Sequence, residues 1–332
     1  MSAIRSRISG LGFHVPPRVV TNDDLSKLMD TNDAWIVERT GIRERHFVDG
    51  DMGSSDLGVE AARKALADAG RTPADVDFVI FATSTPDWMA PGNGVIVQDK
   101  LGLGTVGALD VRNACSGFLH ALSVADAFVR MGQYRCVLVI GAEVQSTALD
   151  LTTRGRDMAV LFGDGAGAAV VEPCTAPQGI LSWALHAEGS MLRELWCEAP
   201  SSRVVGRITP EMMAEGRHFP HMNGRQVFKN ATTRFPEVIH EVLASAGHTL
   251  DEVALVVPHQ ANQRIGDAVA AKLGLPPERV FQNIARYGNT TAASIPIALT
   301  EARDAGLVKP GDLVVLAAFG AGFAWAGCVL RW

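Results

Sequence analysis

The chain of 332 residues contains two similar segments separated by 177 positions, and this internal repeat strongly limits its possible folds. Residues 66–80 (LADAGRTPADVDFVI) and residues 243–257 (LASAGHTLDEVALVV) share Leu, Ala, Ala, Gly, Thr and Val at equivalent positions. Each copy predicts an amphipathic helix that ends at a glycine, a turn that begins at a threonine, and a buried strand. We therefore expect two similar α/β halves.

The later parts of the two halves also correspond. Each half continues with a helix-like run, a buried strand and a glycine-rich hairpin, which are residues 115–122, 136–141 and 163–171 in the first half and 289–294, 312–317 and 320–326 in the second. This order predicts mixed, largely buried sheets, divided near Glu172-Pro173 into an N-terminal half (1–173) and a C-terminal half (174–332). The alternative is two unrelated domains that share common helix–turn–strand patterns. Ligands of such sheets bind beyond the strand ends, so we expect the site where the halves meet.

Charge and hydrophobicity argue against a nucleic-acid-binding or membrane-spanning protein. The chain is 47% hydrophobic and 20% charged, and its net charge of −6 gives no support to a nucleic-acid partner. No apolar run reaches the roughly 18 residues of a membrane helix, and no apolar stretch follows the arginines of the N-terminus, so we expect neither membrane insertion nor a signal peptide. The five cysteines are widely spaced, which fits a reducing compartment and predicts a cytoplasmic protein.

Cys115 lies where a strand-like run, 108–111, turns into a helix-like run, 115–122. A thiol at a helix start faces the positive end of the helix dipole and unpaired backbone N–H groups, which are expected to lower its pKa and make it nucleophilic. The small neighbours Ala114, Ser116 and Gly117 leave room for a substrate. The alternative is a cysteine that only fills the core.

Two residues of the second half stand at comparable places. His259 follows the strand 255–257 directly and is preceded by Pro258, while Asn289 opens the helix that corresponds to the helix of Cys115. Three strand ends thus offer a thiol, an imidazole and a carboxamide. His218 and His221 have no third ligand at useful spacing, so we expect no metal site.

Five motifs carry a specific resemblance. They are residues 30–45 (DTNDAWIVERTGIRER), 113–118 (NACSGF), 162–167 (FGDGAG), 258–262 (PHQAN) and 287–294 (YGNTTAAS). In order, and over essentially the whole chain, they resemble the β-ketoacyl-[acyl-carrier-protein] synthase III family. The resemblance implies a thiolase-like α/β fold, with two duplicated halves in a five-layered α-β-α-β-α arrangement.

The resemblance also implies a mechanism. Cys115 would take an acyl group from acyl-CoA, and the acyl-enzyme would condense with malonyl-acyl-carrier protein, with loss of CO₂, to give a 3-oxoacyl product that initiates fatty acid synthesis. His259 and Asn289 would donate hydrogen bonds to the thioester oxygen, and the backbone N–H groups of Cys115 and Ala321 would form an oxyanion hole. Coenzyme A thioesters would be substrates, with no permanently bound cofactor, and a homodimer is implied.

The family's binding residues can be placed on this chain. Trp35 and one of Arg154 and Arg156 resemble the pair that flanks the adenine of coenzyme A, although Trp35 alone is also compatible with core packing. Further positions resemble those near the tunnel mouth that receive phosphopantetheine or the acidic carrier protein. They are Arg39, Lys229, Gln260, Arg264 and Lys272. Each basic residue alone is also compatible with a solvated surface charge.

Ala90 and Phe162 are expected in the acyl pocket. Ala90 falls where some members present a phenylalanine from the partner subunit, so its methyl group predicts space for a longer or bulkier primer than acetyl. The segment 194–222 is extended relative to compact fatty-acid initiators. Three alternatives stay open: a secondary-metabolism relative of alkylquinolone or polyketide type with a longer or aromatic primer and malonyl-CoA or another acceptor, a Cys–His thioester hydrolase, and a non-catalytic acyl-CoA-binding relative.

Overall fold

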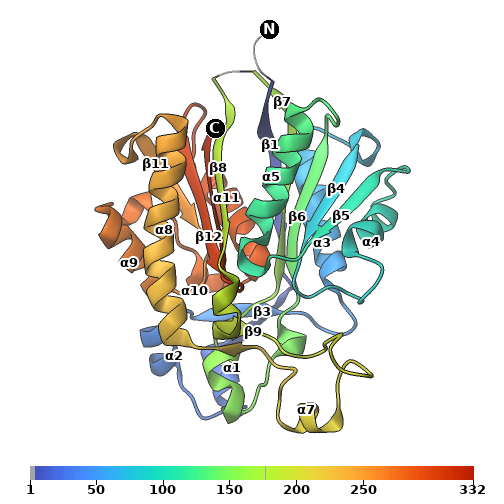
Figure 1. Ribbon diagram of the computed structural model, residues 1–332, viewed down its shortest axis with the longest axis vertical. Coiled ribbons are helices and arrows are strands. Elements are labelled where there is room, and N and C mark those ends of the chain that lie inside the picture. The colour runs from blue at the N-terminus through green and yellow to red at the C-terminus, as the bar shows by residue number, and fades with distance from the viewer. Residues whose placement is uncertain (1–3, 176) are drawn as a thin grey trace.

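The computed structural model describes residues 4–175 and 177–332. Two β-sheets stand side by side, with helices between them and on both outer faces (Figure 1). The layers run α-β-α-β-α, which confirms the predicted fold class.

The first sheet has the strand order β1-β7-β6-β4-β5. Its central strand β6 runs parallel to β4 and antiparallel to β7, while β5 forms one edge beside β4. The strands are β1 (Arg5–His14), β4 (Phe78–Ala82), β5 (Gly107–Val111), β6 (Val137–Glu143) and β7 (Gly165–Cys174). Every residue of β6 is buried, as expected for a strand covered on both faces.

The second sheet repeats this plan with the order β8-β13-β12-β11. Val280 pairs with Val256 of β11 in an isolated parallel bridge, so Val280 takes the place beside β11 that β5 takes beside β4 in the first sheet. The strands are β8 (Gly179–Ala187), β11 (Val253–Pro258), β12 (Leu313–Gly320) and β13 (Ala324–Arg331). The first sheet is thus formed by residues 5–174 and the second by 179–331; we propose a division between the halves near residue 173.

Two helices, α5 (Gly117–Arg130) and α11 (Ser294–Asp304), form the middle layer between the sheets. The largest hydrophobic core joins both helices to both sheets through fully buried residues such as Leu122 of α5 and Leu299 of α11. A helix in this position must be apolar on most of its surface, which α5 is.

The outer layers are also equivalent. Helices α3 (Ser54–Asp68) and α4 (Asn93–Lys100) cover the first sheet, and α8 (Gly224–Ala246) and α9 (Gln263–Leu273) cover the second (Figure 1). The remaining elements lie mostly at one end of the sheets: β2 (Arg18–Thr21), α1 (Asn22–Ser26), α2 (Asp33–Thr40), β3 (Glu44–Phe47), α6 (Arg156–Ala159), β9 (Leu195–Trp196), α7 (Pro210–Ala214), β10 (His221–Met222) and α10 (Ile284–Tyr287). In the described part of the chain, no helix combines the length and apolar character needed to cross a membrane.

Candidate active site

Cys115 lies in a 3-10 turn, η2 (Ala114–Ser116), between β5 and α5. The turn begins with an unusual backbone, since Ala114 has a φ of +42°. Thr291, 177 positions later, has a φ of +50° in the equivalent turn η8 (Thr291–Ala293) before α11. Positive φ costs a residue other than glycine on the order of 1–3 kcal/mol and is concentrated at functional sites. The repeat therefore extends to a strained turn in each half.

Gly320, at the end of β12, gives the sulfur of Cys115 its space. A Cβ atom placed on Gly320 would lie 2.5 Å from Cys115 Cβ and 2.9 Å from Sγ. Such distances are closer than van der Waals contact allows, so this approach of the second half to the nucleophile requires glycine.

The thiol of Cys115 is buried, and this changes its acidity. Burial raises the pKa of Cys115 to about 12, and the Glu143 carboxylate adds to the effect, while hydrogen bonding from the backbone N–H groups of Ala321 and Cys115 acts in the opposite direction. The prediction that the helix start lowers this pKa is therefore wrong for the resting protein, because desolvation outweighs the N–H groups. The resting thiol is protonated at neutral pH, so attack requires a base.

His259 follows β11, and its ring is anchored on one side only. Nδ1 lies 2.6 Å from Ser294 Oγ, while Nε2 is buried without a hydrogen-bond partner among the described residues. Burial lowers the pKa of His259 to about 3, so the imidazole is neutral at pH 7. Because a serine hydroxyl both donates and accepts, Ser294 is compatible with either neutral tautomer. Nε2 is then free to accept or to donate a proton.

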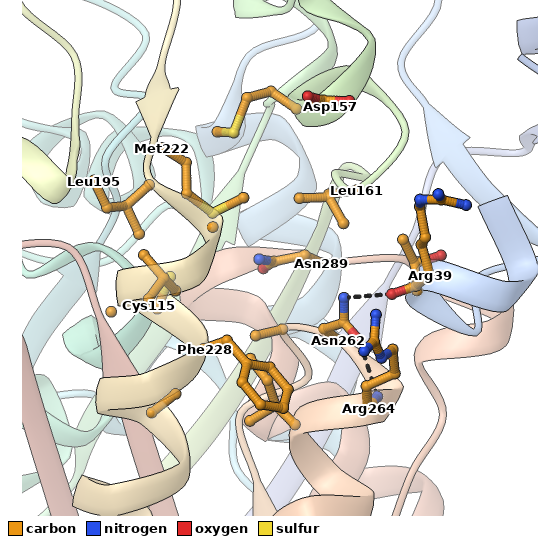
Figure 2. Close-up of a pocket in the computed structure, with 18 of the residues that line it drawn as sticks. Arg39, Cys115, Asp157, Leu161, Leu195, Met222, Phe228, Asn262, Arg264 and Asn289 are labelled. Atoms are coloured by element: carbon orange, nitrogen blue, oxygen red, sulfur yellow. Dashed lines mark hydrogen bonds between the residues drawn. The ribbon is translucent and has the colours of Figure 1, made fainter. Parts of the chain in front are cut away.

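Asn289 is fixed by its main chain and by its side-chain oxygen. Its N–H donates to Leu161 O at 2.8 Å, its carbonyl accepts from Gly163 N at 3.1 Å, and Oδ1 accepts from Thr291 N at 2.9 Å. This leaves Nδ2 as the donor that faces the site. Figure 2 shows the carboxamide end directed toward the side of the cavity on which Cys115 lies.

Cys115, His259 and Asn289 line the same cavity of about 520 Å³. Cys115 comes from the first half and the other two residues from the second, so the cavity lies where the halves meet, as expected from the sequence. Its remaining wall is largely apolar and includes Leu161, Phe162, Leu195, Met222, Phe228, Phe235 and Phe319. A cavity of this size accommodates a small-molecule ligand.

Trp35 lines this cavity, and two arginine side chains lie over its ring. The guanidinium carbons of Arg39 and Arg156 lie 4.4 Å and 4.6 Å from the ring centre. Arg154 instead pairs with Asp150 at 2.6 Å. Of the two arginines that the sequence left open, the structure brings Arg156 to Trp35, where cation–π attraction holds it.

Arg39 and Arg264 also line the cavity, and a hydrogen bond connects their segments. Asn262, the N-cap of α9, donates from Nδ2 to the carbonyl oxygen of Arg39 at 3.0 Å, and Arg264 N donates to Asn262 Oδ1 at 2.9 Å (Figure 2). The predicted basic residues Arg39 and Arg264 are thus brought together at the cavity.

Gln260, Lys229 and Lys272 do not line the cavity. The Gln260 side chain is buried, donates to two backbone carbonyls and accepts from one backbone N–H. Because these bonds occupy its amide, the prediction that Gln260 contacts coenzyme A or the carrier does not fit the structure. Lys229 is exposed on α8, and Lys272 Nζ donates to Thr232 O at 2.9 Å.

The expected acyl-pocket residues have different positions. Phe162 lines the cavity and forms a bridge with Asn289, whereas Ala90 is exposed and lies outside the cavity of its own chain. In the extended segment 194–222, β9 and β10 pair antiparallel and place Leu195 and Met222 on the cavity wall. The described residues contain no group of three His, Cys, Asp or Glu side chains arranged to hold a metal ion.

Ser294 and Gly320 were not assigned roles from the sequence. Ser294 lies within the motif 287–294, and Gly320 within the last glycine-rich turn. The sequence feature that could have indicated Gly320 is its position at the end of β12, the strand equivalent to β6. The contact of Ser294 with His259 joins residues 35 positions apart and has no sequence signal of its own.

Together, the duplicated five-layered fold and a cavity shared by the two halves define a thiolase-like condensing enzyme. The family model of 3-oxoacyl-[acyl-carrier-protein] synthase III matches residues 109–189, and the model of that synthase's C-terminal region matches residues 243–332. The chain belongs to the 3-oxoacyl-[acyl-carrier-protein] synthase III family.

Individual relatives agree over nearly the whole length. The chain is 46% identical to a β-ketoacyl-[acyl-carrier-protein] synthase III of Symbiobacterium thermophilum, covering 98% of this chain and 97% of the relative. The solved 3-oxoacyl-[acyl-carrier-protein] synthase III of Aquifex aeolicus superposes with a TM-score of 0.90 at 43% identity, covering 98% and 100% of the two chains. The solved priming β-ketosynthase of the R1128 polyketide biosynthetic pathway gives 0.91 at 36% identity, covering 100% and 98%.

Proposed function

We propose that this protein condenses an acyl-CoA primer with malonyl-acyl-carrier protein, with loss of CO₂, to form the 3-oxoacyl product that starts fatty acid synthesis. The observation that carries this proposal is the meeting of Cys115, His259 and Asn289 in one cavity. Membership of the synthase III family supports the reaction class, an acyl transfer by a condensing enzyme.

In the first half-reaction, Cys115 Sγ attacks the carbonyl carbon of the acyl-CoA thioester. His259 Nε2 accepts the thiol proton, since the neutral imidazole has a free ring nitrogen there. The oxyanion forms beside the N–H groups of Cys115 and Ala321, the two donors that favour negative charge on the sulfur. The C–S bond to coenzyme A then breaks, and the leaving thiolate takes the proton from His259, which leaves an acyl thioester on Cys115.

In the second half-reaction, decarboxylation of the malonyl group generates the carbon nucleophile, so no base has to remove a proton from carbon. Negative charge grows on the malonyl thioester oxygen, and Asn289 Nδ2 and His259 Nε2–H donate to it. The carbanion attacks the acyl carbon, the bond to Cys115 breaks, and the Cys115 thiolate takes up one proton from solvent, which is the proton that the reaction consumes as CO₂ leaves. Asn289 does not ionise, so it donates at any working pH.

The entrance of the cavity fits a nucleotide thioester and an acidic carrier. We assign Trp35 and Arg156 to the adenine ring, and Arg39 and Arg264 to phosphate groups, because an aromatic ring and cations lie together there. Lys229, exposed on the neighbouring helix α8, is assigned to the acidic carrier protein. These chemical steps require coenzyme A thioesters as substrates and no resident cofactor.

We infer that the primer is not acetyl. The cavity wall is largely apolar, and Leu195 and Met222 of the extended segment 194–222 form part of it. The similarity to a priming β-ketosynthase of a polyketide pathway supports a second candidate, a secondary-metabolism enzyme with the same chemistry and a different primer. Both candidates share the assignment of Cys115, His259 and Asn289.

We further infer a homodimer formed along β5. This strand is an edge of the first sheet and exposes Leu109, and Trp88, Met89 and Val95 are exposed nearby. The backbone N–H of Asn93 donates to the Asp110 carboxylate at 2.6 Å, which connects the segment of Trp88 and Met89 to the strand. An exposed apolar edge strand is a site for pairing with another chain. Ala90 would then approach the partner's cavity.

Intact-mass measurement with an acyl-CoA panel, with and without malonyl-carrier protein or malonyl-CoA, tests the reaction. We expect an acyl adduct on Cys115 that is discharged as a 3-oxoacyl product. Release of free acid alone would identify a hydrolase, and the absence of any adduct would identify a binding protein. The variant Cys115→Ser is the control for the site of the adduct.

A further inference from the structure

The turn η8 of the second half is equivalent to the turn η2 that carries Cys115. A side chain, that of Glu143, fills the space beside η8 that is open beside η2. With the offset of 177, Ala292 corresponds to Cys115 and Gly320 corresponds to Glu143. Gly320 leaves room for the Cys115 sulfur, whereas the Glu143 side chain occupies the equivalent strand end of β6. The backbone N–H of Ala292 acts on the Glu143 carboxyl and lowers its pKa. The equivalent of the oxyanion hole is thus occupied by the protein's own carboxylate.

Glu143 is fully buried and closely surrounded by donors. Its carboxylate accepts from Ser84 N at 3.0 Å, from Ser84 Oγ at 2.9 Å and from Thr85 Oγ1 at 2.6 Å. Thr85 Oγ1 in turn accepts from Val144 N at 2.9 Å, and Val144 is the residue equivalent to Ala321. Burial raises the pKa of Glu143 to about 7 against the effect of these donors. Of the two N–H groups that would make a second oxyanion hole, that of Val144 donates to Thr85 Oγ1 and that of Ala292 acts on the Glu143 carboxyl.

Gln145 connects this filled site to the candidate active site. Its Nε2 donates to Thr291 Oγ1 at 3.0 Å and lies 3.4 Å from Glu143 Oε2. Thr291 has the φ of +50° described above, an outlier for a β-branched residue, and its N–H donates to Asn289 Oδ1. A continuous series of contacts thus runs from Glu143 through Gln145 and Thr291 to the carboxamide of Asn289.

We propose that Gln145, anchored by Glu143, is a positioning residue that holds the strained Thr291 turn so that Asn289 presents Nδ2 to the malonyl thioester. The inference rests on the proposed function, since it concerns the second half-reaction. The main chain of Asn289 is held independently by Leu161 O and Gly163 N. Loss of Gln145 is therefore expected to shift the Thr291 turn with its N–H and so loosen the carboxamide, while the backbone of Asn289, Cys115 and its oxyanion donors stay in place.

The test uses Gln145→Met, which keeps the length of the side chain and removes its donor. We expect the kcat of condensation to fall about tenfold with an unchanged KM for the malonyl substrate, because a misdirected donor weakens transition-state stabilisation. Acylation of Cys115, followed by intact mass, should stay within about twofold of wild type. Gln98→Met is the matched control, because Gln98 Nε2 donates only to the carbonyls of Leu103 and Gly104, outside the cavity lining.

A double-mutant cycle with Thr291→Val separates positioning from general loss of stability. Valine keeps the β-branched shape and removes Oγ1, so the double variant should lose about as much condensation activity as either single variant. Additive losses, or acylation and condensation that fall together in Gln145→Met, would overturn the proposal. If wild type forms no 3-oxoacyl product, the proposed function is wrong, but the positioning role of Gln145 can still be tested by a crystal structure of Gln145→Met. An unchanged bond between Asn289 Oδ1 and Thr291 N there would overturn the positioning role.

Discussion

Ser294 Oγ lies 2.6 Å from His259 Nδ1, and this contact leaves Nε2 as the ring nitrogen available at the cavity. Ser294 also accepts from Gln260 N at 3.4 Å, so its hydroxyl is fixed between the ring and the backbone that follows His259. The orientation of the imidazole therefore depends on the first residue of α11, the helix that follows the Asn289 turn.

Ser294→Ala should slow both half-reactions, because both use His259 Nε2. A free Nδ1 lets the ring rotate and leaves a buried polar atom unpaired, and we expect a loss of about tenfold in each rate. Single-turnover acylation and steady-state condensation measure the two. Ser182→Ala is the control, since Ser182 Oγ donates to the Val242 carbonyl at 2.7 Å and is likewise buried but does not line the cavity. Equal losses in the two variants would argue against the role of Ser294.

Gly320→Ala should strongly slow the acylation of Cys115. The added methyl would meet Cys115 Cβ at 2.5 Å and Sγ at 2.9 Å, so either the nucleophile turn or the end of β12 must move. We expect acylation at least about a hundredfold slower, since a displacement of about 1 Å at a reacting group has that effect. Gly104→Ala provides the comparison, because a Cβ on Gly104 meets nothing within 4 Å. Wild-type acylation by Gly320→Ala would show that the turn is less constrained than its geometry indicates.

Arg156→Ala and Arg154→Ala should differ in their effect on coenzyme A binding. Arg156 lies over Trp35, and its removal should raise the KM for acyl-CoA about tenfold, since a stacking cation contributes about 0.5–2 kcal/mol. Arg154 pairs with Asp150 and faces Phe219, so its variant should stay within about twofold of wild type. Steady-state kinetics with varied acyl-CoA gives both values. The reverse order would transfer the adenine contact to Arg154.

His259 should make the fold sensitive to acid. Its pKa falls from the ordinary 6.5 to about 3 in the folded protein, so below pH 6.5 the unfolded chain binds more protons than the folded one. This contribution to stability is complete above pH 6.5 and is lost as the pH falls toward 3, by up to several kcal/mol. Urea unfolding between pH 4 and 7 should show a shallower pH dependence for His259→Asn than for wild type. His240→Asn, on the exposed face of α8, should keep the wild-type slope.

The sequence predicts those parts of this protein that depend on chain order. The 177-residue offset places Phe78–Ala82 and Val253–Pro258 in equivalent strands, and it places Ala114 and Thr291 in equivalent turns. Strand ends singled out Cys115 after β5 and His259 after β11. The expected strand end before Asn289 is wrong, because the short helix α10 precedes it, and Asn289 was indicated instead by its place before the turn that repeats the turn of Cys115.

Properties that depend on packing could not be predicted in this way. The pKa of Cys115 is set by how completely the other half, through Gly320, excludes water from the thiol. Gln260 adjoins His259 in the chain, but its amide is buried among backbone groups. Arg154 and Arg156 are only two residues apart, Arg154 in the 3-10 helix 153–155 and Arg156 at the start of α6. Which of them reaches Trp35 depends on the exact backbone path there, and the sequence pattern does not determine that path.

Leu195→Trp should reduce activity with long primers more than with short ones. This variant tests whether the extended segment 194–222 shapes the acyl pocket. Leu195 lies on the cavity wall with Met222, so an indole there occupies volume that a longer acyl chain needs. We expect kcat/KM for the longest accepted primer to fall at least about tenfold, while the shortest changes less than about threefold, since each lost methylene contact is worth roughly 1 kcal/mol. The control is Leu192→Trp, because Leu192 is 48% exposed in the preceding 3-10 helix. Should both variants keep the wild-type primer profile, the acyl chain must lie elsewhere, and the exposed Ala90 would be examined next by Ala90→Phe in the dimer.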